Sequence, residues 1–487
     1  MKILKGNSGN SVLLAIVKVF TTVSGILSTM IMSHALSLEL YGTFSQTNLI
    51  VTTATNLTAL GLIDAVNYFY NRSNDESVQK AYINTIMGFQ AITGVIAGLL
   101  IIFLSNNLVD YFNNPMLSNF FWLIAFRPLF ANLNVSLQYL QVSIGKAKSV
   151  AVRNAGFAIL RLAVYAVAAW VLHDITIVLI AFLAFEVIIT IFFAWTFVKE
   201  KFMIKLYEID WKKAKEILGY SIPMGIYVLT NSLCRDIDKM LIGGWYSTDQ
   251  YAIYTNCATL LPFDIISASF LTVLIPILTR YFGEKDYIHG RILFKNYLKI
   301  GYYTSFTFTI ACMILSKEMV LFLYGEKYLS GQSIFIIYTV VDMIKFANMS
   351  IVLSVSGKTS TLMVCSLASL VANAGCNIVF YNVFGFVGPA IATVFVTVIL
   401  TMILADMSAK SLETSIWKLL DWKEFFLFAG ELIGMGSVCF VLKRMMETVG
   451  AKPLLILCIL GAAYILGIFI FNKKKIITAM KEINNLH

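Results

Sequence analysis

Uniformly apolar stretches of about 20 residues recur along the whole chain, and they constrain its fold more than any other feature. A helix needs about that many apolar residues to cross the hydrocarbon core of a bilayer. Charged residues make up only 13% of the sequence, whereas soluble domains carry roughly 25%. The stretches are also too long and too uniform for the alternating strands of a membrane β-barrel. The sequence therefore predicts an all-α protein that crosses the membrane many times.

The predicted spans number about fourteen. They cover residues 11–34, 42–66, 81–104, 118–141, 151–172, 175–198, 219–245, 251–279, 298–316, 331–355, 360–381, 387–408, 424–443 and 453–471. The segments between them alternate in basic charge, with 26 Lys and Arg on one side and 5 on the other. Because basic residues accumulate on the cytoplasmic side, both termini are predicted to be cytoplasmic. The net charge of +10 then reflects topology and not nucleic-acid binding.

An internal repeat divides the chain. The segment ELYGTFSQTNLI (39–50) is similar to DQYAIYTNCATL (249–260), and SIGKAKS (143–149) is similar to SVSGKTS (354–360), at an offset of about 210 residues. Six spans repeated in the same orientation are typical of parallel transporter repeats. The repeat predicts an N-lobe over 1–198, a cytoplasmic amphipathic linker over 199–218 and a C-lobe over 219–408. Two further spans and a basic cytoplasmic tail are predicted over 409–487.

Two cytoplasmic segments mix basic with aromatic residues. They are KEKFMIKLYEIDWKKAKEIL (199–218) and RYFGEKDYIHGRILFKNYLK (280–299). This pattern is typical of helices that lie flat on a membrane surface, with their bases toward anionic headgroups. A surface helix is therefore expected in each segment.

Charges inside the spans are the candidate functional groups. The stretch NSLCRDIDKMLIGGW (231–245) places four charges in five positions, and helical spacing puts Arg235, Asp238 and Lys239 on one face with Asp236 at its edge. One charge at the bilayer centre costs roughly 2.5–3.5 kcal/mol, so four would cost on the order of 10 kcal/mol if they faced lipid. They form either structural ion pairs or the wall of a watery cavity.

Several basic residues in spans have no acid in their own helix, which favours an anionic ligand over an organic cation. The candidate substrate-binding cations are Lys18, Arg127, Arg235, Lys239 and Lys345. The acids predicted as ion sites, proton sites or structural partners are Asp64, Asp238 and Asp342, with Asp238 expected to hold Arg235. For Lys18 and for the remaining cation, Arg161, extension of the side chain to the membrane surface is the alternative.

Other chemistries find little support in the sequence. The four His are scattered and the seven Cys lie in apolar segments without a CxxC pair, so no metal site is predicted. SGKTS (356–360) lacks the spacing of a phosphate-binding loop. The loops are too short for a catalytic domain, so the chain is expected not to be an enzyme.

The sequence resembles the polysaccharide-flippase branch, the Wzx type, of the multidrug/oligosaccharidyl-lipid/polysaccharide exporter superfamily. The resemblance is carried by ALSLELYGTFSQTNLI, LGLIDAVNYFYN and DIDKMLIGGWYSTDQYAIYTNCATL, and by LTVLIPILTRYFGEKD, LYGEKYLSG and FGFVGPAIATVF in the second half. It implies two lobes in the bacterial cytoplasmic membrane that alternate access. It implies transfer of undecaprenyl-diphosphate-linked oligosaccharide to the outer leaflet for O-antigen, capsule or exopolysaccharide synthesis.

The same resemblance implies a monomer without a cofactor, surrounded by membrane lipids and working with other polysaccharide-assembly proteins. Na⁺, H⁺ and the membrane potential remain alternative sources of drive. Three other functions stay open: a lipid II flippase, a multidrug antiporter, and a polymerase or ligase of the same pathway. A multidrug antiporter would favour acids in its cavity, and a polymerase would require a large external loop.

Overall fold

The computed structural model describes residues 3–72, 75–263 and 265–485 and forms two compact units, Met1–Ala252 (unit 1) and Ile253–His487 (unit 2). The helices that begin in unit 1 are α1 (Ile3–Ala35), α2 (Leu38–Ala59), α3 (Leu62–Asn71), α4 (Glu76–Phe103), α5 (Ser105–Phe112), η1 (Pro115–Asn119), α6 (Phe121–Ile124), α7 (Arg127–Ser143), α8 (Ala147–Ala166), η2 (Val167–Leu172), α9 (Ile175–Glu200), α10 (Trp211–Trp245) and α11 (Thr248–Cys257). Unit 2 continues with α12 (Ile265–Glu284), α13 (Tyr287–Ile314), α14 (Ser316–Leu323), η3 (Glu326–Gly331), α15 (Gln332–Ile344), α16 (Ile351–Val355), α17 (Thr359–Phe384), η4 (Gly385–Val387), α18 (Gly388–Ser411), α19 (Ile416–Leu419), α20 (Trp422–Thr448) and α21 (Pro453–Asn485).

The all-helical membrane fold predicted from the sequence is confirmed, and each predicted span falls on a helix or on a broken helix of the described chain. By length and composition, eight described segments can cross a membrane, or nine if α13 and α14 form one span bent by 87°. The segment Thr359–Ser411 among them contains two helices, α17 and α18. Among the spans outside this set, those at α6–α7, α11–α12 and α15–α16 are interrupted helices.

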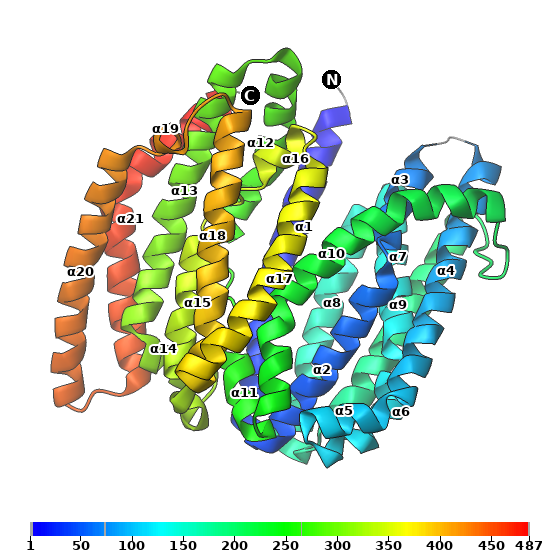
Figure 1. Cartoon of the computed structure of the whole chain (residues 1–487), viewed down its shortest axis with the longest axis horizontal. Coiled ribbons are helices and arrows are strands. Elements are labelled where there is room, and N and C mark those ends of the chain that lie inside the picture. The colour runs from blue at the N-terminus through cyan, green and yellow to red at the C-terminus, as the bar shows by residue number, and fades with distance from the viewer. Residues whose placement is uncertain (1–2, 73–74, 264, 486–487) are drawn as a thin grey trace. The chain divides into compact units, whose positions relative to one another are not determined.

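In unit 1, α4, α7 and α9 lie side by side and α10 packs on α2, α3 and α4 (Figure 1). Because of this packing, the boundary between the compact units falls at Ala252/Ile253 and not in the linker 199–218. The lobes drawn from the sequence repeat describe an order of spans, and they stay a prediction.

Polar residues inside the spans of unit 1 bind one another, as buried polar groups must. Gln90 on α4 donates to the Ser136 hydroxyl on α7 at 2.6 Å, and Thr93 donates to the backbone oxygen of Thr58 at 3.0 Å. Asn132 on α7 donates to the Thr58 hydroxyl at 3.3 Å. These bonds tie α2, α4 and α7 together at the centre of the unit.

Span 2 is broken between α2 and α3, where Gly61 has a left-handed φ of 68°. The break lies against α10 near its internal proline, Pro223. A Cβ added to Gly61 would lie 2.2 Å from the backbone oxygen of Ser221, and one added to Gly225 would lie 2.4 Å from the backbone carbon of Leu60. The two glycines therefore permit a backbone contact that a larger residue would block.

The linker differs from its prediction. Residues 201–210 form no helix, and 211–218 are the first turns of α10, so the surface helix predicted over 199–218 is wrong. The non-helical stretch is bound to α4 instead: the backbone N–H of Lys205 donates to Asn84, and that of Asp210 donates to the Thr85 hydroxyl, both at 3.0 Å. A Lys205–Glu208 ion pair raises the pKa of Lys205 and lowers that of Glu208.

The second surface helix is also wrong, because the chain turns between α12 and α13. Lys285 has a left-handed φ of 57°, and the Asp286 carboxylate then accepts the backbone N–H of His289 at 3.1 Å. This hydrogen bond caps the start of α13 and lowers the pKa of Asp286.

Unit 2 contains the last two spans, α20 and α21, which lie side by side and contact α13 (Figure 1). Lys443 on α20 forms a 2.7 Å ion pair with Glu318 in the first turn of α14, and both side chains are almost fully buried. Lys299 on α13 pairs with Glu424 on α20, and Glu424 also accepts from the Tyr303 hydroxyl at 2.8 Å. Ion pairs thus hold α20 to the helices of unit 2.

Candidate functional site

Three of the four charges in the charged segment of α10 form a local network. The carboxylate of Asp236 lies 3.2 Å from the amine of Lys239 and 3.8 Å from the guanidinium of Arg235. Lys239 and Asp236 are mostly buried, with 16% of each side chain exposed, whereas 57% of the Arg235 side chain is exposed. Arg235 is thus the more accessible of the two cations.

The ion pair formed by Arg235 differs from the expected one, because it goes to Asp236 and not to Asp238. Asp238 is 1% exposed and lies inside the unit, on the face of α10 that packs against its neighbours. Helical spacing placed Arg235 and Asp238 on one face, but in the structure Asp238 is buried and Arg235 is mostly exposed. The bend of the long arginine side chain toward its immediate neighbour is a rotamer choice that spacing does not predict.

A polar link connects this cluster to α2. Arg235 donates to the Ser232 hydroxyl at 3.4 Å, and Asn56 on α2 donates to the same hydroxyl at 2.6 Å. On α5, the Tyr111 hydroxyl donates to the backbone oxygen of Met240 at 3.0 Å. These contacts position the charged segment of α10 against the rest of unit 1.

Arg127 is already engaged by a carboxylate. Its guanidinium donates to both oxygens of Glu186 on α9, at 3.1 and 3.3 Å, and to Asn48 on α2 at 3.2 Å. The ring of Phe182 lies 4.6 Å from the guanidinium carbon, and only 8% of the Arg127 side chain and 17% of the Glu186 side chain are exposed. Sequence reasoning missed this pairing, although a lone acid in one apolar span and a lone cation in another are a signal for it.

The other predicted residues are spread over both units. Asp64 is half-buried in the first turn of α3, close to the phenol of Tyr220. In unit 2, Asp342 accepts the backbone N–H of Leu261 at 2.9 Å, and Lys345 is exposed where α15 ends. The backbone of Lys18 belongs to α1, but its side chain lies outside the described residues. Among the described side chains of unit 1, the predicted substrate-binding residues that the structure brings together are Arg235 and Lys239.

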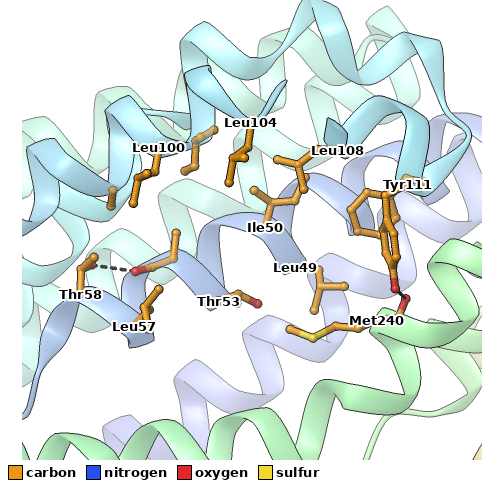
Figure 2. A pocket seen from close by; sticks show the side chains of 14 residues that line it. Leu49, Ile50, Thr53, Leu57, Thr58, Leu100, Leu104, Leu108, Tyr111 and Met240 are labelled. Carbon is orange, nitrogen blue, oxygen red and sulfur yellow. Dashed lines mark hydrogen bonds between the residues drawn. The ribbon is translucent and has the colours of Figure 1, made fainter. Parts of the chain in front are cut away.

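An apolar cavity of about 330 Å³ lies within unit 1, close to the charged segment. Figure 2 shows Leu100 of α4, Leu104 between α4 and α5, and Leu108 of α5 on one side, with Ile50 and Leu57 of α2 and Met240 of α10 on the other. Its lining is almost entirely hydrocarbon. The hydroxyl of Thr58, which also lines it, donates to the backbone oxygen of Ala54 at 2.7 Å.

In the part of the chain that the structure describes, no three His, Cys, Asp or Glu residues gather as a metal site would require. The cysteines there are all free thiols.

Comparison with solved structures identifies the fold. The lipid II flippase MurJ in an inward closed conformation aligns with a TM-score of 0.74 and 14% identity, over 96% of this chain and 100% of that one. A multidrug resistance MATE family transporter in an inward-facing conformation aligns at 0.64 and 14%, over 82% and 98%. A transporter of the MOP superfamily from Pyrococcus furiosus aligns at 0.55 and 13%, over 84% and 96%. No curated protein sequence matches the chain.

The fold and its apolar helices thus define a multi-pass membrane protein that shares the fold of these solved structures. A family model described as "polysaccharide biosynthesis protein" matches residues 31–333. The chain belongs to this family.

Proposed function

We propose that the protein is a flippase that moves undecaprenyl-diphosphate-linked oligosaccharide units from the inner to the outer leaflet of the bacterial cytoplasmic membrane. The observation that carries the proposal is the match of a polysaccharide-biosynthesis family model to a chain with a transporter fold. The helices of the described chain are joined by short segments, the longest non-helical one between α9 and α10 being residues 201–210. Transport is therefore favoured over glycan synthesis.

Charge supports an anionic substrate. Arg235 is mostly exposed, with one carboxylate at 3.8 Å and one long hydrogen bond to Ser232, so most of its donors are available to a phosphate. A planar guanidinium binds phosphate oxygens in pairs, which a point charge cannot do. We assign Arg235 as the first contact of the diphosphate, with Lys239 beside it and Lys18 and Lys345 as further cations.

Arg127 takes a different role in this proposal. Because Glu186 already accepts two of its hydrogen bonds, Arg127 is assigned as a residue that positions α7 against α9. Asp64, Asp238 and Asp342 stay the candidate sites for Na⁺ or H⁺ coupling. Both termini are placed in the cytoplasm by the distribution of Lys and Arg, and the working unit is a monomer.

The second candidate is transport of lipid II, which the likeness to the flippase MurJ along nearly the whole chain favours. Both substrates carry a diphosphate on a polyprenyl chain and differ in the attached glycan. A multidrug antiporter is less well supported, because an exposed arginine in a span would repel organic cations.

The test is a leaflet-exchange assay in proteoliposomes with the full-length protein. Fluorescent undecaprenyl-diphosphate oligosaccharide, placed in both leaflets, is bleached from outside by a membrane-impermeant reductant. The protein is expected to make nearly all of the probe bleachable, and fluorescent lipid II to exchange much more slowly. Equal exchange of both probes would favour the second candidate. If neither probe exchanged faster than in protein-free liposomes, flippase activity would be refuted.

The role of Arg235 is tested in the same assay. Arg235→Gln alone removes one of the two cations that pair with Asp236. The double variant Arg235→Gln with Asp236→Asn removes the carboxylate charge as well, so no unbalanced charge is left by the loss of Arg235. Exchange is expected to fall at least tenfold in both variants at wild-type protein levels, and Arg235→Lys is expected to recover only part of it. Full exchange by the double variant would mean that the ion pair is only structural.

A further inference from the structure

The apolar cavity of unit 1 lies next to the charged segment of α10. Met240 lines the cavity and lies one helical turn beyond Asp236, the carboxylate that pairs with Arg235 and Lys239. On the facing helix, Thr53 and Leu57 line the cavity, and Asn56 between them reaches the Ser232 hydroxyl to which Arg235 also donates. A charged group and a hydrocarbon-lined hollow are thus neighbours on the same two helices.

The lining of the cavity suits a hydrocarbon chain and not a glycan. Leu100, Leu104 and Leu108 project toward α2 from one side, and Leu57 and Met240 close the other (Figure 2). A sugar ring would lose its hydrogen bonds to water here without replacement, which costs several kcal/mol for each unpaired group. At about 330 Å³ the cavity lies at the lower end of ligand pockets, so it accommodates a short length of chain.

The position of the cavity along the membrane normal suits the part of a lipid chain that lies next to the headgroup. The lining residues come from the middle and C-terminal part of α2, from the C-terminal end of α4, from α5, and from the part of α10 that follows the charged segment. With the N-terminus in the cytoplasm, the segments of α4, α5 and α10 belong to the outer half of the membrane, and the α2 residues extend the cavity to the membrane centre. Most of a long polyprenyl chain would then extend into the surrounding bilayer.

We propose that this cavity binds the isoprene units next to the diphosphate of a polyprenyl-diphosphate lipid, while Arg235 contacts the diphosphate. The inference rests on the proposed function and assigns a lipid subsite within it. The pairing of charge and hydrocarbon is what distinguishes this occupant from a neutral lipid. The cavity thereby retains the carrier lipid on the outer side of unit 1 while the glycan moves between leaflets.

The experiment uses the full-length wild-type protein in proteoliposomes with undecaprenyl diphosphate bearing a photoreactive diazirine in the isoprene units nearest the diphosphate. Crosslinks are mapped by mass spectrometry. They are expected in residues 49–58 and 97–112 and at Met240. Excess undecaprenyl diphosphate is expected to abolish them, whereas excess phosphatidylglycerol is not. Equal competition by phosphatidylglycerol would identify an ordinary lipid site and overturn the proposal, as would crosslinks only outside these segments.

Two adjacent leucines give a matched pair of variants. Leu100 lines the cavity and is 45% exposed, whereas Leu99 does not line it and is 62% exposed. Leu100→Trp is expected to lower crosslinking in 49–58 at least fivefold, and Leu99→Trp to leave it unchanged. Equal effects of the two variants would contradict the assignment. Arg235→Gln is expected to lower crosslinking as well. Unchanged crosslinking in this variant would contradict the contact between Arg235 and the diphosphate.

The result is separable from the flippase test. Leaflet exchange without specific crosslinks in these segments would leave the proposed function standing and refute the subsite. Specific crosslinks without leaflet exchange would support a polyprenyl-diphosphate site and refute the flippase.

Discussion

A cation inside an apolar helix is stabilised in two different ways in unit 1. Arg127 is enclosed, with two hydrogen bonds to Glu186 and one to Asn48, whereas Arg235 extends from α10 and shares Asp236 with Lys239. Burial of an ion pair is costly unless its hydrogen bonds are satisfied, and the guanidinium of Arg127 meets that condition. The first pair therefore contributes to a defined helix packing, and the second leaves donors available to a ligand.

The Arg127–Glu186 pair gives a prediction about stability. Glu186→Gln should lower thermal stability and membrane abundance strongly, because it leaves a buried cation without its counter-charge, at a cost of about 3–5 kcal/mol. Arg127→Met with Glu186→Met should recover most of the loss, since neither charge is then buried. The measurements are protein abundance in membranes and the melting temperature in detergent.

Arg72 and Glu216 provide the control. They form an ion pair of 2.5 Å between α10 and the end of α3, but 53% and 43% of their side chains are exposed. Exposed pairs contribute about 0–1 kcal/mol, so Glu216→Gln should have little effect. If Glu186→Gln were as mild as this control, the buried pair would have no structural role.

Asp286 gives a prediction about pH. Its pKa is lowered by hydrogen bonds from His289, so the stabilisation is present above the ordinary value near 3.8 and is lost as the pH falls through the folded value. Asp286→Ala should lower the melting temperature at pH 7, and its difference from wild type should shrink at acidic pH. Asp110→Ala, at a carboxylate with no hydrogen bond in the described chain, is the control. A difference that does not change with pH would exclude this explanation.

At the scale of elements, the interruption of span 2 is paired with the kinked part of α10. The chain leaves the helix at Leu60 and Gly61, both with left-handed φ, and this turn fits against the backbone of α10 at Gly225. Apolar periodicity predicts a continuous helix here, because the break depends on a contact between helices and not on a local composition change. Gly61 was a visible signal, but a single glycine does not distinguish a break from a packing site.

Two glycines of α10 make a matched test of this contact. Gly225→Ala would place a Cβ 2.4 Å from the backbone of Leu60 and should destabilise the protein by about 1–3 kcal/mol, as overpacking does. Gly219→Ala meets nothing within 4 Å and should be neutral or slightly stabilising, since alanine favours helix. Melting temperatures of the two variants in detergent would decide, and equal values would argue against the close contact.

At the scale of the whole molecule, topology is the prediction that supports the proposed direction of transport. Single cysteines at the exposed positions Ser118 and Ser247 should react with a membrane-impermeant thiol reagent from outside, in a background without native cysteines. Cysteines at Ser149 and Asp286 should react only after the membrane is permeabilised. Reversed labelling at any two sites would contradict the fourteen-span order and the cytoplasmic termini.

The helical membrane fold and the positions of its apolar helices could be predicted because each span requires a long apolar stretch, a property local to the sequence. The partner of Arg127 could not, because Glu186 lies 59 residues away and their contact depends on how α7 packs on α9. The prediction of a surface helix in the linker was wrong for a related reason. Its basic and aromatic residues favour a surface helix, but Asn84 and Thr85 offer its backbone other hydrogen bonds. The cavity arises from four helices and has no signal in any one of them.

The binding of residues 201–210 to α4 has a consequence for proteolysis. A ten-residue stretch without helix is ordinarily where a protease cuts first, because the enzyme must draw an extended segment into its own cleft. Here Asn84 and Thr85 hold the backbone at Lys205 and Asp210, and Gly88 approaches the backbone oxygen of Leu206. The basic residues of this stretch should thus resist trypsin in the folded protein, although Lys201 and Lys205 are favoured sites in the unfolded chain.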